Sequence, residues 1–280
     1  MKKIKKDVVN LRKYLSRKKK VLNAIEAKLK HHSCVYSLFS KYNWFSEVKR
    51  QIQIWGKNPK KSLKKREISI PEYELFRYLC TDSIFQRFLA AFDAIETITK
   101  SDKSRYGKWN SSKKLLFSKN VSQIYSSLFE ILILGKLIAS NKNVEPYYQN
   151  IDGRIKIDKR FIYFEIKSLQ KSEHDLSGEC GATSIEYDKK QIFRALREKA
   201  KQLYPYRNKP TIVFLSLYQL ADEITGEISV TEYMETKDGT VISAVVMYDW
   251  FTAKDGKKVI INKNSCVPLK KTEISYLEGA

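Results

Sequence analysis

The sequence has few of the residues that build zinc sites and disulfide frameworks. Its 280 residues include only four cysteines and three histidines. No two cysteines stand in a C-x-x-C spacing, so the pattern indicates neither a zinc site nor a disulfide scaffold. Unpaired thiols are typical of a reducing compartment, and we therefore expect a cytoplasmic protein.

Long apolar segments and nucleotide-binding motifs are also missing. The longest apolar run, around residues 128–139, is shorter than a bilayer span and contains Glu130 and Lys136. The first nine residues, MKKIKKDVV, lack the apolar segment of a signal peptide. No G-x-x-x-x-G-K-[ST] motif occurs, so the chain has no ATP site of its own. We expect no membrane partner.

Acidic residues are scarce in the first part of the chain. Residues 1–120 hold 10 Asp and Glu against 30 Lys and Arg, whereas residues 121–280 hold 21 against 23. Cations that contact phosphates release counterions and give affinity for nucleic acid of any sequence. The distribution predicts that residues 1–110 form a basic helical domain that binds nucleic acid, with DNA as the expected partner.

The densest group of cations lies in GKNPKKSLKKRE, residues 56–67, where six of twelve residues are Lys or Arg. The glycine and proline in this segment favour a loop. We expect the loop to grip phosphates, a solvated linker being the alternative. The residues expected to bind nucleic acid are Lys60, Lys61, Lys64, Lys65 and Arg66.

The segment most informative about chemistry is IDGRIKIDKRFIYFEIKS, residues 151–168. Its Ile, Phe and Tyr residues predict two short strands, 154–157 and 161–167, with a polar turn between them. If Asp158 and the following lysine form a two-residue turn, the register places one acid, Asp152, opposite the second acid of the segment.

That second acid is Glu165, and the opposed pair has a chemical consequence. Directly opposed residues share one face of a sheet, with Cβ atoms roughly 4.5–5.5 Å apart. Two carboxylates at that separation can hold one hard cation, with water in its remaining positions. Lys167 follows two residues after Glu165 and therefore shares the face. A metal and a lysine together would activate water and stabilise charge during hydrolysis of a phosphodiester.

These residues resemble the PD-(D/E)XK nuclease superfamily, which has the restriction-endonuclease-like fold. Asp152 matches the first acid of the motif, Glu165 the second acid and Lys167 the lysine. Ile151 stands where the motif has its proline. The resemblance covers roughly residues 120–220, in the order helix, acid, hairpin, E-x-K, helix, strand.

The segments on both sides are similar to the same family. Residues 126–140 resemble its leading helix, which often carries a glutamate that faces the site, here Glu130. Residues 187–203 and 209–218 resemble the next helix and strand, and some members use a Gln or Lys on that helix, which makes Gln191 a candidate. The resemblance implies catalytic roles for Asp152, Glu165, Lys167 and Gln191, and metal binding by Asp152, Glu165 and Glu130.

Alternatives stay open for several of these residues. Asp152 and the glycine after it also form a common turn pair. Asp158 is an alternative first acid, although it lies at the hairpin tip, far along the strand from Glu165. Glu130 and Gln191 also fit solvent-facing positions on their helices.

The expected fold class is α/β: a restriction-endonuclease-like core, a central mixed sheet flanked by helices, over residues 111–225. Ahead of it we predict helices over 4–30, 35–55 and from Pro71 to about 99, and a linker at 101–114. Behind it we predict a β-rich extension, residues 226–280. There the pair Asp238-Gly239 stands between strand-like runs and favours a hairpin.

The function implied by the resemblance is that of a Mg²⁺-dependent endonuclease acting on DNA, with Mn²⁺ as a substitute for Mg²⁺. Both a type II restriction-like enzyme and a stand-alone defence or repair nuclease fit, and a homodimer stays open. The alternatives are a non-catalytic DNA-binding protein on a nuclease-like fold, and a nuclease directed at RNA. The aromatic residues and lysines of 35–66 suit single-stranded RNA as well as DNA.

Overall fold

The computed structural model describes residues 2–57, 71–169, 184–217, 223–248 and 257–279. By their contacts the residues divide into two compact units. The helical unit consists of residues 1–92 and 112–125, and the sheet unit consists of residues 93–111 and 126–280.

The helical unit is built from amphipathic helices whose aromatic residues meet in a core. Its helices are α1 (Lys2–Lys30), α2 (Ser33–Lys41), α3 (Trp44–Lys57), α5 (Pro71–Leu79) and most of α6 (Asp82–Thr99). The Phe39 ring meets Trp44 edge to face at 4.9 Å and Phe117 at 5.0 Å. The helix predicted over 4–30 is confirmed.

Two of the predicted helices are interrupted. The stretch predicted as one helix over 35–55 turns between α2 and α3, where Asn43 has φ 52°. Asparagine tolerates this left-handed conformation better than most residues do. The stretch that begins at Pro71 is likewise divided, into α5 and α6.

The linker predicted at 101–114 is wrong, because most of it belongs to helix α7 (Lys103–Leu115). Asp102 caps this helix by accepting the backbone N–H of Ser104 at 2.9 Å. Trp109 is fully buried, and its indole N–H donates to the carboxylate of Glu96. A single buried tryptophan thus fixes a segment whose composition is otherwise that of a loop.

The sheet unit contains one mixed sheet with the strand order β1-β2-β3-β4-β5-β6. Strands β1 to β3 pair antiparallel, β3 to β5 pair parallel, and β6 returns antiparallel to β5. The strands are β1 (Val144–Pro146), β2 (Gly153–Ile157), β3 (Arg160–Ser168), β4 (Thr211–Ser216), β5 (Ala244–Tyr248) and β6 (Lys257–Ile261).

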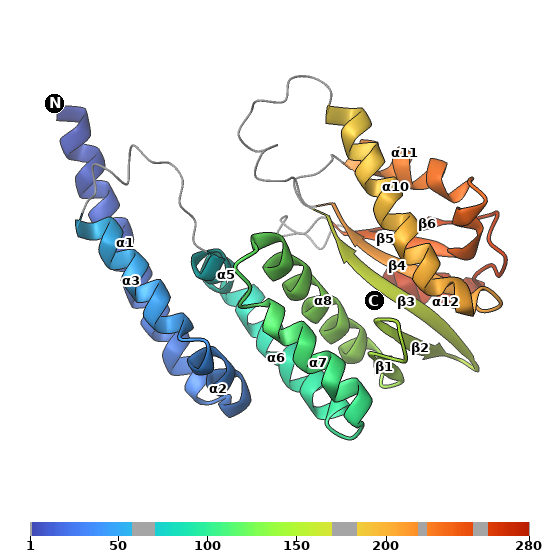
Figure 1. The fold of residues 1–280 in the computed structure, drawn as a ribbon, viewed down its shortest axis with the longest axis horizontal. Coiled ribbons are helices and arrows are strands. Elements are labelled where there is room, and N and C mark those ends of the chain that lie inside the picture. The colour runs from blue at the N-terminus through green and yellow to red at the C-terminus, as the bar shows by residue number, and fades with distance from the viewer. Residues whose placement is uncertain (1, 58–70, 170–183, 218–222, 249–256, 280) are drawn as a thin grey trace. The chain divides into compact units, whose positions relative to one another are not determined.

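Helices cover both faces of this sheet (Figure 1). On one face α10 (Ser184–Leu203) and α11 (Glu223–Met234) follow β3 and β4 and supply the crossovers that parallel strands need. On the other face α8 (Val121–Ser140) contacts the sheet through Phe129, whose ring lies 5.9 Å from that of Tyr248. The predicted α/β class, a mixed sheet flanked by helices, is confirmed.

The longest apolar run was predicted to be too short to span a bilayer, but it lies within a longer apolar helix, α8. By length and composition it is the one described helix that could cross a membrane. Half of its apolar stretch is buried inside the protein.

The β-rich character predicted for residues 226–280 is wrong over its first part. Residues 223–234 form α11, and Asp238-Gly239 begins a short 3-10 helix, Asp238–Val241, instead of a hairpin. The reason is visible in the buried positions Val230, Tyr233 and Met234, whose spacing is helical. The remaining strands β5 and β6 continue the core sheet, and α12 (Lys271–Gly279) ends the chain.

Candidate active site

The hairpin β2–β3 has the predicted register. Gly153 pairs with Phe164 and Ile157 pairs with Arg160, so the two residues between the strands form the turn. Asp152 precedes the first pair and therefore stands opposite Glu165. Asp152 Oδ2 accepts the backbone N–H of Ile166 at 2.7 Å, which fixes the orientation of this carboxylate beside β3.

The loop that delivers Asp152 is held in an unusual conformation. Tyr147 and Gln149 have φ 54° and φ 49°, in the left-handed region that non-glycine residues rarely adopt. The backbone N–H of Tyr147 donates to the carbonyl of Asp152 at 2.7 Å and closes the loop. Such residues cost of order 1 kcal/mol each, so the surrounding contacts must hold them in place.

The glycine after Asp152 has a packing reason to be there. Gly153 lies within β2, and a Cβ added to it would come within 2.4 Å of the Phe164 ring and 2.9 Å of the Glu145 carbonyl. The pair Asp152-Gly153 is thus more than an exposed turn: the glycine lets β1, β2 and β3 approach closely.

A lysine that the sequence analysis missed lies beside both acids. Lys199 of α10 forms an ion pair with Glu165 through Nζ, and the same nitrogen lies 3.6 Å from Asp152 Oδ2. Glu165 is only 1% exposed. The signal for Lys199 was present, because it falls on the buried stripe Ile192, Leu196 and Leu203 of α10, where a lysine is out of place.

The electrostatics of this cluster follow from its burial. Burial, and then the negative charge of Asp152, raise the pKa of Glu165 to about 9, against the opposing effect of Lys199. Burial lowers the pKa of Lys199, but the two acids more than compensate and raise it. Glu165 therefore holds its proton more tightly than an ordinary glutamate, and Lys199 holds its charge more tightly than an ordinary lysine.

One oxygen of the cluster lacks a hydrogen-bond partner. Glu165 Oε1 is buried and has none, whereas Oε2 of the same carboxyl contacts Lys199. A buried polar atom without a partner costs roughly 1–3 kcal/mol. An oxygen of this kind, beside a second carboxylate, is a suitable ligand for a hard cation such as Mg²⁺.

The other predicted site residues lie at different distances from the pair. Glu130 of α8 accepts the hydroxyl of Tyr147 at 2.8 Å, and its charge contributes to the raised pKa of Lys199. Lys167 is partly exposed, and its Nζ lies 3.7 Å from Glu198 Oε2 of α10. No hydrogen bond in the described part of the chain joins Gln191 to the acids, and Lys199 is the residue of α10 that reaches them.

Aromatic rings border the acid pair along β3. Tyr163, two residues before Glu165 on the same face, stacks on Tyr206 at 4.4 Å with 18° between the rings. The guanidinium of Arg154 lies between the rings of Tyr148 and Phe161, at 3.8 Å and 4.0 Å from their centroids. These ring contacts line the sheet beside the acids.

Two predictions remain, the phosphate-gripping loop and the metal centre. The cations Lys60, Lys61, Lys64, Lys65 and Arg66 lie outside the described residues. Among the residues that are described, no group of three or more His, Cys, Asp or Glu side chains is placed to hold a metal ion. A metal at this site would therefore depend chiefly on two side-chain ligands, Asp152 and Glu165.

Comparisons with protein-family models, with curated proteins and with solved structures found no match to this chain.

Proposed function

We propose that the sheet unit is a metal-dependent nuclease that hydrolyses phosphodiester bonds in DNA. The observation that carries the proposal is the meeting of Asp152 and Glu165 across the β2–β3 hairpin, with the Lys199 ammonium contacting both. The two acids already attract one cation, the Lys199 ammonium, so their surroundings suit positive charge. The PD-(D/E)XK resemblance is part of this proposal.

The donor set fits Mg²⁺. Asp152 and Glu165 would supply carboxylate oxygens, including the buried Oε1 that has no partner, with water in the remaining positions. Glu130 is a candidate ligand by the resemblance alone, because no described group of three acids is placed to share a cation. When bound, Mg²⁺ would neutralise charge on the phosphate and lower the pKa of the attacking water.

The side chains around the pair have separate tasks in this proposal. The backbone N–H of Ile166 keeps Asp152 oriented towards Glu165. Lys199 balances the acids and keeps them together. Lys167 follows Glu165 by two residues on β3 and its side chain is partly exposed, so in this proposal it would contact a phosphate oxygen or a water molecule.

Burial of Glu165 beside a second acid favours an enzyme over the non-catalytic alternative. A protein that only binds DNA has no use for a buried glutamate beside a second acid, because buried charges cost more stability than they return unless they are well paired. Lysines alone would supply its affinity. An assay with DNA and RNA substrates distinguishes a deoxyribonuclease from a ribonuclease.

The experiment is an incubation of the purified full chain with supercoiled plasmid, single-stranded DNA and RNA. Each substrate is tested with Mg²⁺, with Mn²⁺ and with EDTA. We expect plasmid cleavage with either metal and none with EDTA. Cleavage of RNA alone would select the RNA-directed alternative, and binding without cleavage of any substrate would select the non-catalytic one.

A further inference from the structure

Helix α10 has a second charged face, which points away from the sheet. Lys190, Arg194, Arg197 and Lys201 are exposed and stand four, three and four residues apart, so they lie on one side of the helix. We call these four residues the α10 stripe. At 1.5 Å per residue the stripe extends over about 16 Å.

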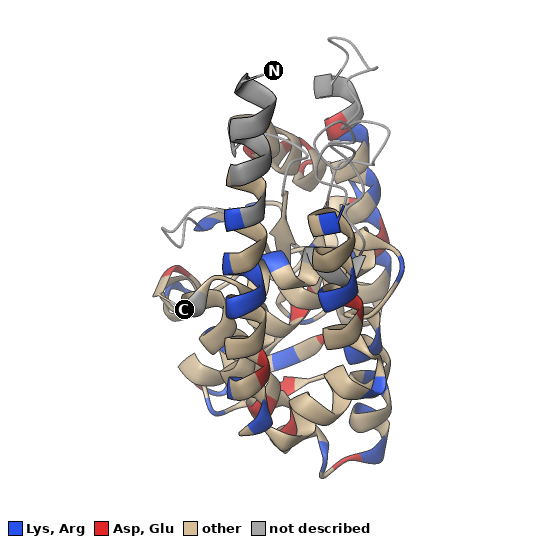
Figure 2. Cartoon of the chain, turned by 90° about the vertical axis from the view of Figure 1, so that its left-hand side faces the viewer, with Lys and Arg blue, Asp and Glu red and all other residues tan. Residues whose placement is uncertain are grey.

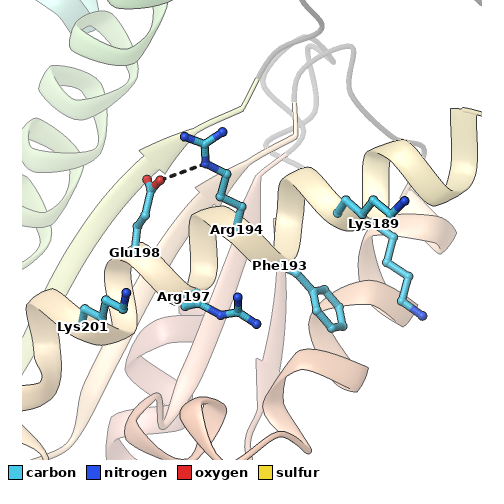
Figure 3. Close-up of a pocket in the computed structure, with 7 residues that line it drawn as sticks. Lys189, Phe193, Arg194, Arg197, Glu198 and Lys201 are labelled. Carbon is cyan, nitrogen blue, oxygen red and sulfur yellow. Dashed lines mark hydrogen bonds and ion pairs between the residues drawn. The ribbon is translucent and has the colours of Figure 1, made fainter.

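The stripe lines an open groove of about 720 Å³ (Figure 3). Lys189, Phe193 and Glu198 complete the lining. The Phe193 ring meets Tyr233 of α11 edge to face at 5.5 Å, which fixes one wall of the groove. Cations therefore outnumber acids in the lining by five to one.

Acids beside the groove hold its cations only weakly. Arg194 Nε lies 3.3 Å from Glu198 Oε1, and Arg197 Nε lies 3.7 Å from Asp238 Oδ2. All four of these side chains are at least half exposed. Exposed ion pairs contribute about 0–1 kcal/mol, so a phosphate can replace these acids at little cost.

The stripe is connected to the candidate site through one carboxylate. Glu198 contacts Arg194 with Oε1 and lies 3.7 Å from the Lys167 amine with Oε2. A polyanion that follows the stripe therefore passes the residue that also contacts Lys167. The groove and the acid pair lie on two sides of the same helix within one unit.

We propose that the α10 stripe binds the phosphate backbone of the DNA substrate and guides it towards Asp152 and Glu165. This inference rests on the proposed nuclease function. A polyphosphate is the occupant that the chemistry favours, because the cations form a line along the helix. Each phosphate contact releases a counterion, so binding through the stripe weakens as salt rises.

The test removes the four positive charges of the stripe. It compares the effect on DNA binding with the effect of removing four positive charges elsewhere in the sheet unit. One variant carries Lys190→Gln, Arg194→Gln, Arg197→Gln and Lys201→Gln. The matched control carries Lys142→Gln, Lys263→Gln, Lys270→Gln and Lys271→Gln, four exposed lysines of the sheet unit on elements other than α10. Anisotropy of a fluorescein-labelled DNA duplex in EDTA gives Kd at several salt concentrations, and a thermal melt checks folding.

We expect the stripe variant to bind DNA at least about tenfold more weakly, with a salt slope reduced by about 2–4. The control should change Kd less than about threefold. Equal Kd values for the two variants would overturn the inference. So would a loss of binding to polyglutamate that matches the loss for DNA, since that would assign the stripe to an acidic protein.

A second substitution tests the link to Lys167. Glu198→Gln removes the one acid of the groove lining, and we expect DNA to bind about two- to threefold more tightly. Glu278→Gln, an exposed acid on α12, is its control and should leave Kd unchanged. Because EDTA prevents cleavage, these results judge the stripe separately: a failed stripe with normal plasmid cleavage leaves the nuclease proposal intact.

Discussion

The two units carry almost the same number of cations and differ in their acids. The helical unit holds 26 Lys and Arg against 7 Asp and Glu, and the sheet unit holds 27 against 24. In the helical unit Lys and Arg recur along α1 and its neighbours (Figure 2). In the sheet unit, by contrast, charges of both signs meet in particular places.

The difference separates two uses of charge. Unbalanced cations give affinity for any polyanion, and their individual positions matter little. In the sheet unit one cluster, Asp152, Glu165 and Lys199, depends on where each of its three members stands. We therefore expect DNA binding to weaken gradually as cations of the helical unit are removed. In the cluster we expect the effect of a substitution to depend on which residue is changed.

The largest effect should come from Lys199→Met in the sheet unit. The substitution removes the positive charge beside the buried Glu165 and the partly buried Asp152, and we expect the free energy of unfolding in EDTA to fall by about 3 kcal/mol. Urea denaturation measures it, and Lys201→Met, exposed on the same helix, should change it by less than about 0.5 kcal/mol. A Lys199→Met protein as stable as wild type would mean that the acids need no cation.

The prediction for the helical unit concerns five cations that are replaced together. Replacing Lys60, Lys61, Lys64, Lys65 and Arg66 by Gln should weaken binding to DNA about thirtyfold for all sequences alike, with a smaller salt slope. Filter binding with two unrelated duplexes measures this. Selective loss for one duplex would show that the segment reads sequence, and the contrast between the units would then fail.

Lys167→Met should reduce single-turnover cleavage by about tenfold, equivalent to about 1.4 kcal/mol of transition-state stabilisation. The methionine keeps most of the stem and loses the ammonium, while Asp152 and Glu165 stay in place. A thermal melt should show an unchanged fold. Wild-type cleavage by the folded variant would remove Lys167 from the mechanism.

A further test of the cluster concerns pH. The folded-state pKa of Glu165, about 9, lies above its ordinary value of 4.5, so the folded protein binds the extra proton between these values. Stability in EDTA is therefore greatest at low pH in this window and falls as pH rises towards 9, because the unfolded chain releases this proton near its ordinary pKa while the folded protein holds it. Guanidinium melts measure the slope, and Glu165→Gln should flatten it.

Local features of the sheet unit could be predicted from the sequence, and distant ones could not. The hairpin register follows from a two-residue turn and from the pleat, which involve only neighbouring residues. Lys199 comes from 34 residues beyond Glu165 on another element, and no local pattern links the two. The one sequence signal for Lys199 is its position among the buried apolar residues Ile192, Leu196 and Leu203 of α10.

Two of the wrong predictions, the linker and the β-rich extension, have a common physical cause. Composition favoured a loop at 101–114 and strands after residue 224, but burial decided both segments. Trp109 anchors α7 to Glu96, and Val230 and Tyr233 bring α11 onto the core. Tertiary contacts of a few large side chains thus outweighed the local preference of many small or polar ones.

Cleavage of supercoiled plasmid in Mg²⁺ by Asp152→Asn and Asp158→Asn, measured side by side, tests the central claim most directly. Both substitutions remove one carboxylate from the same hairpin, one opposite Glu165 and one at the exposed tip. The account predicts that Asp152→Asn loses at least about a hundredfold in rate, about 2.7 kcal/mol, while Asp158→Asn cleaves as wild type. Wild-type cleavage by Asp152→Asn would contradict it.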